Sequence, residues 1–388
     1  MMTSHNKSSR SLLLSLASAV ALIAYTAIFL VAETEVALVS IIVFGSIAIF
    51  LLKRFGKLAQ ISHAFSTHQR TMNFAVIAGV LFLAALFYDN HYNLFLITTV
   101  ILYLVACLGM NIQLGYAGVI NFSVASFFGI GGYTSAVLTM QTNLPHLLII
   151  LAGGLAAAAI GSLLLLPVLR TSGHYAALVT IAFALLFKTF LEVNDSLGGP
   201  QGLQVAGMHL FGFEFNNGIV IGDIDISFYL PYVILSLLLA IAAFSITKRL
   251  ERSWIGLNMD AIRLDETAAA CFGLSIPRWK IKAFTFGNFI IGIAGAVYGM
   301  LVGYIAPSNF TFGDSLILMS IVLLGGLGNP WGVVVATSIV IVLPEKLQVI
   351  QEYRFLLYAI VVTLMLLYQP AGLLPRQLRC YIPGWRAK

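Results

Sequence analysis

Polar groups suited to binding chemistry gather in a glycine-rich segment, LGYAGVINFSVASFFGIGGYTSAVL, at residues 114–138. Glycines allow a helix to break, and the free N–H groups at a helix start carry partial positive charge. An anionic group such as a carboxylate is stabilised at such a helix start, and Asn121, Ser123 and Ser126 would add hydrogen bonds. The alternative is close helix packing through small residues. The glycines that suit either purpose are Gly129, Gly131 and Gly132.

A second glycine-rich segment, LLGGLGNPWG at 323–332, separates two apolar runs that are each short for a membrane span. Gly325, Gly326, Gly328 and Pro330 together do not sustain a regular helix. The pattern predicts a re-entrant or broken helix, which is tolerated only where protein or a water-filled cavity covers it. The alternative is an ordinary turn at the inner membrane face. We assign the polar residues and glycines of both segments to a candidate substrate path.

The polar stretch KRLERSWIGLNMDAIRLDETAAACFGLSIPRWKIK interrupts the apolar chain at 248–282. Asn258 is a candidate N-cap, and residues 259–272 are compatible with one short helix. Gly273 suits the left-handed residue that follows a helix end, and Pro277 then prevents the helix from continuing. The stretch therefore predicts a single helix that is held on the membrane face.

This helix also offers groups for a partner protein. Asp260 and Arg263 have the i,i+3 spacing of an ion pair along one helix. An apolar side is able to dock into a groove on a partner, and small residues permit close approach. The alternative is a solvated helix with no partner. The residues of the apolar side are Ala261, Ile262, Ala268, Ala269 and Phe272.

The remaining reactive side chains are scattered. The seven histidines form no HExxH motif, and the chain has no GxSxG, no P-loop and no Gly-rich Rossmann turn. Cys107, Cys271 and Cys380 form no CxxC pair and have no histidine nearby at ligand spacing. We therefore predict that the protein is not an enzyme, binds no metal and no cofactor of its own, and cannot hydrolyse ATP by itself.

Composition places the chain in a membrane. Hydrophobic residues make up 60% of it and charged residues only 9%, whereas a soluble domain has about 25% charged residues. The net charge of +6 does not indicate nucleic-acid binding, because no basic patch with interleaved aromatic residues is present. The long, separated apolar runs predict an all-α, polytopic transmembrane helical bundle. A β-barrel would instead show weak alternation over about ten residues.

We expect roughly 10–12 spans, broken or re-entrant helices included. The candidate helices lie at 12–31, 36–52, 74–88, 94–113, 118–140, 147–169, 175–192, 228–247, 281–304, 315–325, 331–343 and 355–369.

The basic residues predict the orientation. If the N-terminus is inside and the spans alternate, all of the 21 Lys and Arg fall on the inner side except Lys188, Lys346 and Arg354, as the positive-inside rule requires. Both termini are then cytoplasmic. The polar stretch 192–227 lies outside, where it either meets an extracytoplasmic partner or serves as a plain connection. Lys188 and Glu192 have the spacing of an i,i+4 ion pair near a span end.

Three regions follow from these patterns. We predict an N-terminal extension, 1–93, with about three transmembrane helices and a basic cytoplasmic loop. A glycine-dense core at 94–375 and a basic cytoplasmic tail at 376–388 follow. The run at 12–31 is interpreted as a retained helix rather than a cleaved secretory signal, because it is long and LVA at 30–32 is a poor cleavage site.

The loop WIGLNMDAIRLDETAAACFGLSIPRWKIKAF resembles the cytoplasmic loop of ABC-importer inner-membrane permeases of the high-affinity branched-chain amino acid type. AGAVYG, GYIAPSNFTF, VLLGGLGNPWG and YQPAGLLP, together with GYAGVINFSVASFFGIGGYTSA upstream, also resemble that family, so that the resemblance spans 94–375. The matching positions that would couple to ATPase subunits are Gly256, Ala261, Ile262, Arg263, Asp265, Glu266, Ala268, Ala269 and Gly273.

The resemblance implies a permease subunit of a bacterial inner (plasma) membrane importer. It implies a heterodimer with a second, related permease subunit, two cytoplasmic ABC ATPase subunits that bind the ATP, and a periplasmic or extracellular substrate-binding protein. The coupling helix near 256–273 would receive the motion of the ATPases. The cargo would be leucine, isoleucine or valine. The alternative is the same architecture carrying urea or another small amide or amino acid, because many relatives have a histidine in the stretch matching NFSVASFF and this chain has none.

Two other classes fit less well. An ion-coupled secondary transporter needs ionisable residues at the bilayer midplane, and the predicted spans hold almost none apart from Lys188. A membrane-embedded enzyme needs clustered His, Asp or Glu at membrane depth, and the sequence shows no such cluster.

Overall fold

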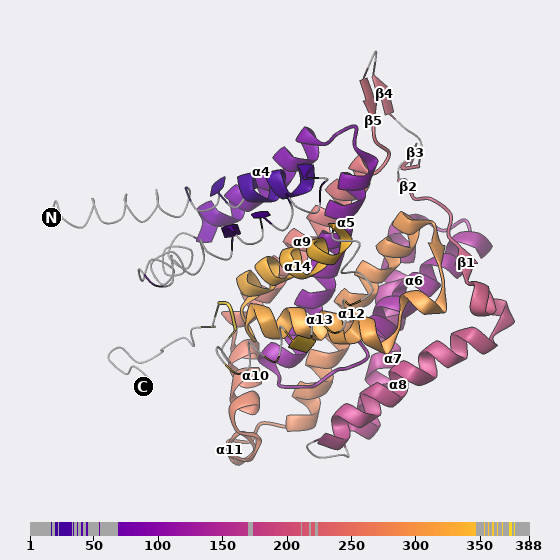
Figure 1. Ribbon diagram of the computed structural model, residues 1–388. Coiled ribbons are helices and arrows are strands. Elements are labelled where there is room, and N and C mark those ends of the chain that lie inside the picture. Colours follow the sequence, from indigo (N-terminus) through magenta and orange to yellow (C-terminus); the bar gives the residue numbers. More distant parts are fainter. Residues whose placement is uncertain are drawn as a thin grey trace. The chain divides into compact units, whose positions relative to one another are not determined.

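A computed structural model describes residues 69–169, 174–210, 212–216, 219–221 and 224–346, and scattered residues between 17 and 54 and between 353 and 376. This part of the chain is built from α-helices with a few very short strands (Figure 1). The predicted all-α polytopic fold is confirmed. Within the predicted helix at 12–31, residues 23–31 are helical as expected, whereas the predicted helices at 36–52 and 355–369 lie largely outside the described residues.

The helices agree with the apolar runs to within a few residues, except where the site described below breaks them. In chain order the helices are α4 (Gln69–Leu86), α5 (His91–Met110), the π-helix η1 (Asn111–Tyr116), α6 (Val124–Gln141), α7 (His146–Leu169), α8 (His174–Val193), η2 (Asp195–Leu197), η3 (Gly199–Gln201), α9 (Leu230–Glu251), α10 (Trp254–Leu264), α11 (Glu266–Cys271), α12 (Ile276–Val302), η4 (Pro307–Asn309), α13 (Phe312–Gly325) and α14 (Pro330–Lys346). The strands are β1 (Leu203–Gln204), β2 (His209–Leu210), β3 (Phe213–Glu214), β4 (Ile219–Ile221), β5 (Ile224–Ile226) and β6 (Tyr304–Ile305), paired antiparallel as β1–β6, β2–β3 and β4–β5.

The chain forms two compact units. The first contains residues 1–97, 218–233 and 342–352, and the second contains 98–217, 234–341 and 353–388. Every feature of the candidate site lies in the second unit. The predicted division into regions at residues 93 and 375 stays a prediction.

Small residues build the core of the second unit. Helix α12 packs along both α6 and α7. A Cβ atom added at Gly131 would overlap the carbonyl group of Gly292, and one added at Gly295 would overlap that of Phe128. The backbones of α6 and α12 therefore touch, which is how helices associate in lipid, where apolar side chains gain little from contact with one another.

Six of the described helices are long and apolar enough to cross a membrane, judged by length and composition. They span His91–Tyr116, His146–Leu169, Tyr175–Val193, Leu230–Glu251, Ile276–Val302 and Pro307–Gly325, and shorter apolar helices lie at Thr71–Leu86 and Pro330–Val342.

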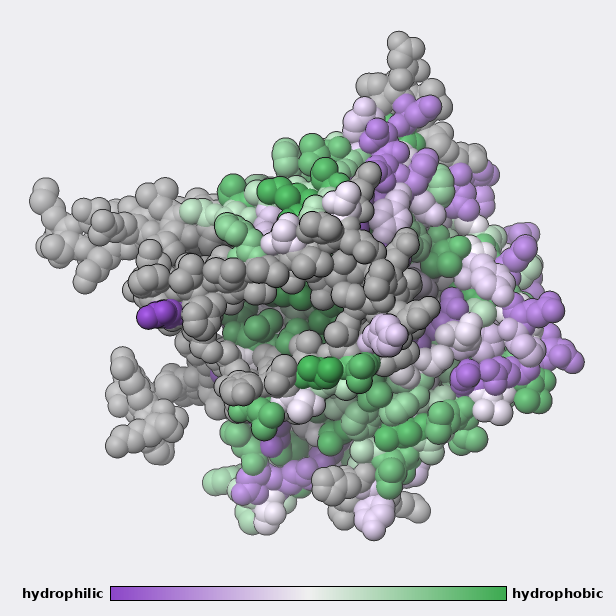
Figure 2. All heavy atoms as spheres, viewed as in Figure 1, coloured by the Kyte–Doolittle hydropathy of each residue, from purple (hydrophilic) through white to green (hydrophobic). Residues whose placement is uncertain are grey.

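Helix α8 is the most exposed of the six, with 17% of its apolar window buried. Figure 2 shows hydrophobic side chains over the visible face of this helix. The predicted pair of Lys188 and Glu192 is confirmed, with 3.4 Å between Nζ and Oε1 and both side chains partly exposed. An apolar face of this kind suits contact with lipid.

Candidate functional site at the break between α5 and α6

The first glycine-rich segment does break a helix. Helix α5 continues into a single π-helical turn, η1, all of whose residues are buried, and residues 117–123 are not helical. The predicted helix at 118–140 therefore begins only at Val124, six residues later than expected, because Gly118 adopts a left-handed φ of 67°. Single π-helical turns inside α-helices are frequent at functional sites.

Three buried amide side chains hold this break together, and we call them the amide cluster: Gln113 in η1, Asn121 in the break and Asn288 in α12. Gln113 Nε2 donates to Asn288 Oδ1 at 2.8 Å and to the Phe284 carbonyl at 3.2 Å. Asn121 Nδ2 donates to Gln113 Oε1 at 2.8 Å. All three side chains are fully buried, so these hydrogen bonds tie α5, α6 and α12 together without competition from water.

Asn121 also shapes the start of α6. Its Oδ1 accepts hydrogen bonds from the backbone N–H of Ser123 at 2.9 Å and from Ser123 Oγ at 2.7 Å. The N–H of Ala125 donates to Ser315 Oγ at 3.0 Å. Side chains of the protein thus accept hydrogen bonds from some of the free N–H groups at the start of α6, and anion binding there stays a prediction. Ser126 Oγ is buried and makes no hydrogen bond with the described residues.

The glycines of the first segment lie at helix contacts. A Cβ atom at Gly129 would come within 2.8 Å of the Phe310 ring, and one at Gly132 within 3.4 Å of the Gly295 carbonyl oxygen. Together with the contact between Gly131 and Gly292, these distances favour close helix packing as the reason for the glycines. Their part in a substrate path stays a prediction.

The second glycine-rich segment separates two helices as expected, because α13 ends at Gly325 and α14 begins at Pro330. Its turn lies against the π-helical turn of the first segment. The N–H of Gly328 donates to Asn111 Oδ1 at 2.9 Å, and a Cβ atom at Gly115 would lie 2.5 Å from the nitrogen of Gly328. The two segments therefore form one site.

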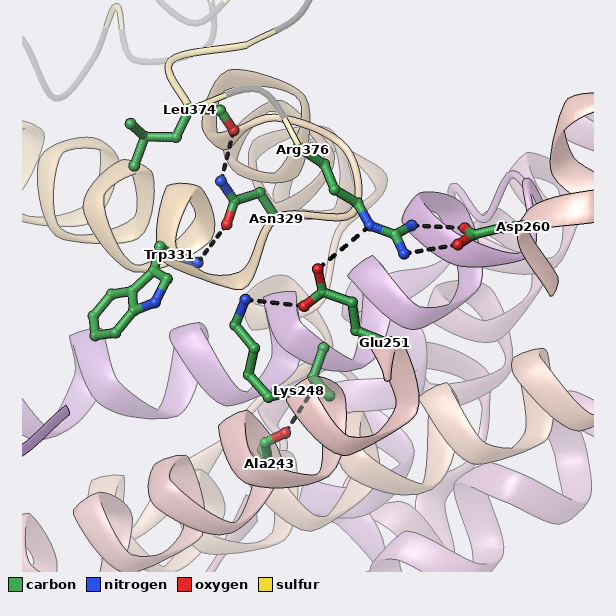
Figure 3. Close-up of polar contacts among 9 residues, drawn as sticks. Ala243, Lys248, Glu251, Asp260, Asn329, Trp331, Leu374 and Arg376 are labelled. Atoms are coloured by element: carbon green, nitrogen blue, oxygen red, sulfur yellow. Dashed lines mark hydrogen bonds and ion pairs between the residues drawn. The ribbon is translucent and has the colours of Figure 1, made fainter. Parts of the chain in front are cut away.

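A C-terminal segment covers this turn. Asn329 Nδ2 donates to the carbonyl of Leu374 at 2.9 Å, as Figure 3 shows. The N–H of Leu373 donates to the Leu324 carbonyl at 2.8 Å, and the N–H of Leu374 donates to that of Gly325 at 3.2 Å. The backbone groups left free at the end of α13 thus find partners in residues 373 and 374.

The polar loop contains two helices, α10 and α11, and not the single coupling helix predicted near 256–273. We call them the loop helices. The N-cap of α10 is Ser253, whose Oγ accepts from the N–H of Gly256 at 3.3 Å, so Asn258 is not a cap. Asp265 ends α10 and caps α11, accepting from Thr267 N at 2.9 Å and Ala268 N at 3.0 Å. An aspartate that bonds the following N–H groups favours a new helix start over a continuing helix.

The expected glycine stop is confirmed. Gly273 has a φ of 80°. Its N–H donates to the Ala270 carbonyl at 2.9 Å, and the N–H of Leu274 donates to that of Ala269 at 3.1 Å. This pair of hydrogen bonds is the Schellman motif, which satisfies the last carbonyl groups of a helix.

The docking face differs in part from the prediction. Gly256, Ile262 and Ala269 are buried within the chain and position the loop helices, so they do not themselves form an outer surface. Phe272, by contrast, is 87% exposed, and Leu264 is 67% exposed. Of the other predicted positions, Ala261 and Arg263 are half-buried, and Asp265, Glu266, Ala268 and Gly273 are exposed. Lys280 Nζ bonds Glu266 Oε1 at 2.6 Å and ties α11 to α12.

One functional candidate was missed by the sequence analysis. Arg376, assigned there to the basic tail, has a side chain only 7% exposed and forms two hydrogen bonds with Asp260, of 2.6 and 2.7 Å (Figure 3). Asp260 thus makes its hydrogen bonds with Arg376, and Arg263, at the expected i,i+3 spacing, interacts with it through charge. The guanidinium also lies 4.3 Å from the centre of the Tyr116 ring. Nothing in the local sequence distinguishes this arginine from its basic neighbours.

Both arginines keep their charge. Burial lowers the pKa of Arg376, but hydrogen bonds to Asp260 and the charges around it outweigh burial, so its pKa is raised overall. Burial lowers the pKa of Arg263, which the charge of Asp260 partly opposes. Guanidinium groups do not deprotonate in proteins near neutral pH, so two positive charges lie beside η1.

Comparison with known proteins identifies the family. Residues 92–368 match the family described as branched-chain amino acid transport system / permease component. The chain is 34% identical over 292 residues to the high-affinity branched-chain amino acid transport system permease protein LivM of Escherichia coli (strain K12), covering 72% of this chain and 69% of the relative.

More distant relatives agree. A probable branched-chain amino acid transport permease protein LivM of Methanocaldococcus jannaschii is 23% identical over 325 residues, covering 71% of this chain and 91% of that protein. The permease protein LivH of Escherichia coli (strain K12) is 22% identical, with the same shares covered. No solved structure shows a significant match. With six helices of spanning length among its described residues, this chain is a multi-pass membrane protein, and it belongs to the family of branched-chain amino acid transport system permease components.

Proposed function

We propose that this chain is the transmembrane permease subunit of an ATP-binding-cassette importer that carries leucine, isoleucine and valine across a bacterial inner membrane. The observation that supports it most is physical continuity between an exposed surface and a buried helix break. The loop helices present apolar side chains at one end of the second unit, and one of them, α10, also contacts η1 and Gly118 in the break.

The exposed surface suits a protein partner. Phe272, Leu264 and Trp254 are large exposed apolar side chains, and exposed polar residues such as Asp265 and Glu266 lie between them in the loop. Figure 2 shows hydrophilic side chains among hydrophobic ones around α10 and α11, which supports a surface that meets water and a protein partner. Large exposed apolar residues rimmed by polar ones are typical of protein interfaces. The partners we propose here are the two cytoplasmic ATPase subunits, which bind the ATP. In this proposal the loop and both termini lie in the cytoplasm.

The helix break is suited to change its arrangement. The side-chain nitrogens Nδ2 of Asn111 and Asn288 are buried and make no hydrogen bond with the described residues. A buried donor without a partner costs free energy. A second arrangement of the break in which these nitrogens find partners would therefore lie close in free energy to the observed one. Closure of the ATPases would then supply the differential binding that shifts the population from one arrangement to the other.

The opposite side of the second unit has its own exposed structure. Strands β1, β2 and β3 follow α8 and lie in the polar stretch that the positive-inside rule assigns to the outside, and β6, which pairs with β1, follows α12. We propose that a substrate-binding protein docks there. A second, related permease subunit completes the pathway against an apolar face of this chain.

Ion coupling has little support from the described spans. Lys188 and Glu192 form a partly exposed pair in the last turns of α8. Asp314 lies in the first turn of α13, where it forms a capping box with Thr311. Ionisable groups that drive a secondary transporter lie near the bilayer midplane instead.

The deciding measurement is uptake of labelled leucine by the native cell with and without this gene, with unlabelled valine, urea and glutamate as competitors. Loss of uptake on deletion, with competition by valine only, is the expected result. Unchanged leucine uptake would contradict the branched-chain assignment. If deletion abolished the uptake of a small amide such as urea instead, that amide would be the substrate of the same permease architecture.

A further inference from the structure

We propose that Arg376 is a positioning residue that relays displacement of α10 to the break between η1 and α6. This inference rests on the proposed function, in which α10 receives motion from a partner. It concerns a residue that lies outside the loop helices and outside the helix break, and that contacts both.

On the side of the loop helices, Arg376 is held by two acids. Its Nη1 and Nη2 donate to Asp260 Oδ1 and Oδ2 at 2.6 and 2.7 Å. Its Nε lies 3.8 Å from Glu251 Oε1, at the end of α9, and Glu251 is itself bonded by Lys248 at 2.9 Å. Figure 3 shows the guanidinium between these two acids. The two-point contact with Asp260 fixes the orientation of the guanidinium as well as its position.

On the side of the break, Arg376 touches two further elements. Its guanidinium stacks over the ring of Tyr116, the last residue of η1. A Cβ atom added at Gly328 would come within 2.7 Å of Arg376 Cδ, so the arginine stem lies directly on the glycine turn. One side chain therefore contacts α10, the π-helical turn and the turn between α13 and α14.

A continuous polar chain leads onward from these contacts. Gly328 donates to Asn111 at the start of η1, two residues before Gln113 of the amide cluster. Gln113 binds Asn288 and is bound by Asn121. Asn121 holds Ser123, immediately before α6. The links from Gly328 to Asn111 and from Gln113 through Asn121 to Ser123 are hydrogen bonds between buried groups, and the backbone of η1 joins Asn111 to Gln113, so a displacement at one end is not absorbed by water.

The pair of Arg376 and Asp260 is suited to transmit motion and not merely to fasten the chain. Asp260 is only 13% exposed, and Arg376 only 7%. Separating two buried charges leaves each without compensation, so the elements that carry them stay in contact while they move. A second contact acts in parallel, because a Cβ atom at Gly118 would come within 3.6 Å of the Arg263 Cα atom. We expect the Arg376 contact to determine the direction of the motion, because of the two arginines it is Arg376 that lies on the turn at Gly328.

The test uses the complete transporter, purified with its partner subunits, and has two readouts. Hydrogen–deuterium exchange of residues 111–123 is measured with and without a non-hydrolysable ATP analogue, which requires no substrate. Leucine uptake per ATP hydrolysed is then measured in vesicles. The variants are Arg376→Gln, Arg376→Lys, Asp260→Asn and the double variant Asp260→Asn with Arg376→Gln. The matched control is Arg249→Gln, which removes one positive charge from an exposed position in the last turn of α9.

In the unmodified transporter and the Arg249→Gln control, we expect the analogue to change exchange at 111–123. In Arg376→Gln this response should be lost, and uptake per ATP should fall about tenfold, the usual scale of coupling between two sites. Arg376→Lys keeps the charge but loses the two-point contact, and it should lie between the two. If Arg376→Gln does not assemble, Arg376→Lys and Asp260→Asn decide the matter.

Opposite outcomes separate the relay from the proposed function. A normal exchange response in assembled Arg376→Gln and Asp260→Asn transporters would overturn the relay, whatever the substrate. Equal loss of uptake and ATP hydrolysis, in proportion to lost assembly, would show a purely structural arginine and would also overturn it. An exchange response that depends on Arg376 in a transporter that carries no branched-chain amino acid would uphold the relay and refute the substrate.

Discussion

The backbone N–H of Gly328 bonds the side chain of Asn111 at 2.9 Å, which joins two glycine-rich segments 217 residues apart in the chain. One segment breaks the helix between α5 and α6, and the other separates α13 from α14. Their contact makes a single polar junction inside an apolar protein. Because α10 and Arg376 both contact this junction, substitutions in and around it test the proposed mechanism.

Replacing Gly328 by alanine should destabilise the protein. Its φ of 79° already disfavours a side chain, and a Cβ atom would meet Arg376 Cδ at 2.7 Å and the Gly115 carbonyl at 3.1 Å. We expect a loss of about 2–4 kcal/mol, which combines backbone strain with overpacking. Thermal unfolding in detergent measures it. Gly212→Ala is the control, because φ is 82° there but no atom lies within 4 Å of the new Cβ. Equal losses for both variants would contradict the contact.

Replacing Gly273 by valine should uncouple ATP hydrolysis from uptake and leave the permease inserted. The space around Gly273 is open, so the cost is the left-handed backbone alone, about 1–2 kcal/mol. We expect the end of α11 to rearrange and to displace Phe272. The measurement is the ratio of uptake to hydrolysis in vesicles. Gly273→Asn should behave almost normally, because asparagine tolerates this conformation. Normal coupling in the valine variant would refute a role for α11 in docking.

Phe272→Ala should weaken assembly with the ATPase subunits without changing the stability of the isolated chain. The side chain is 87% exposed, so its loss removes no intramolecular core contact. Exposed substitutions usually change stability by less than about 0.5 kcal/mol, whereas an apolar anchor at an interface contributes about 2 kcal/mol or more. Co-purification of the ATPase subunits reports the effect. Val193→Ala, at the exposed end of α8, is the matched control. Unchanged co-purification of Phe272→Ala would place the docking surface elsewhere.

Asn121→Ala should cost more stability than Ser123→Ala. The asparagine accepts two hydrogen bonds from Ser123 and donates to Gln113 and, at 3.4 Å, to Asn288, and all of these groups are buried. Its removal leaves a buried N–H and a buried carbonyl without partners, at about 2–4 kcal/mol in total, whereas loss of the Ser123 hydroxyl removes one bond, about 1 kcal/mol. Thermal unfolding ranks the two variants. The reverse order would mean that the amide cluster is not what holds the break.

Local rules predicted several parts of this site correctly. Gly273 ends a helix because only a residue with little steric cost adopts its backbone angle. The same reasoning offered a helix break within 114–138 as one of two alternatives, and it predicted a break between the two apolar runs at 323–332. Asp265 was missed as a helix boundary, although an aspartate followed by two N–H groups it can reach is a recognisable cap. The amides Asn111, Gln113 and Asn288, which interrupt apolar runs, were signals of the same kind.

The sequence by itself determined what depends on near neighbours and on total composition: membrane insertion, helix positions, the glycine breaks and the family. The tertiary structure alone decided which distant groups meet. Arg376 reads as one of several basic residues in a tail, and it becomes a buried partner of Asp260 only when the C-terminal segment lies across the turn between α13 and α14. The physical reason is that burying a charge or an amide costs free energy unless it has a hydrogen-bond partner. Here the partner lies as far as 217 residues away in the chain.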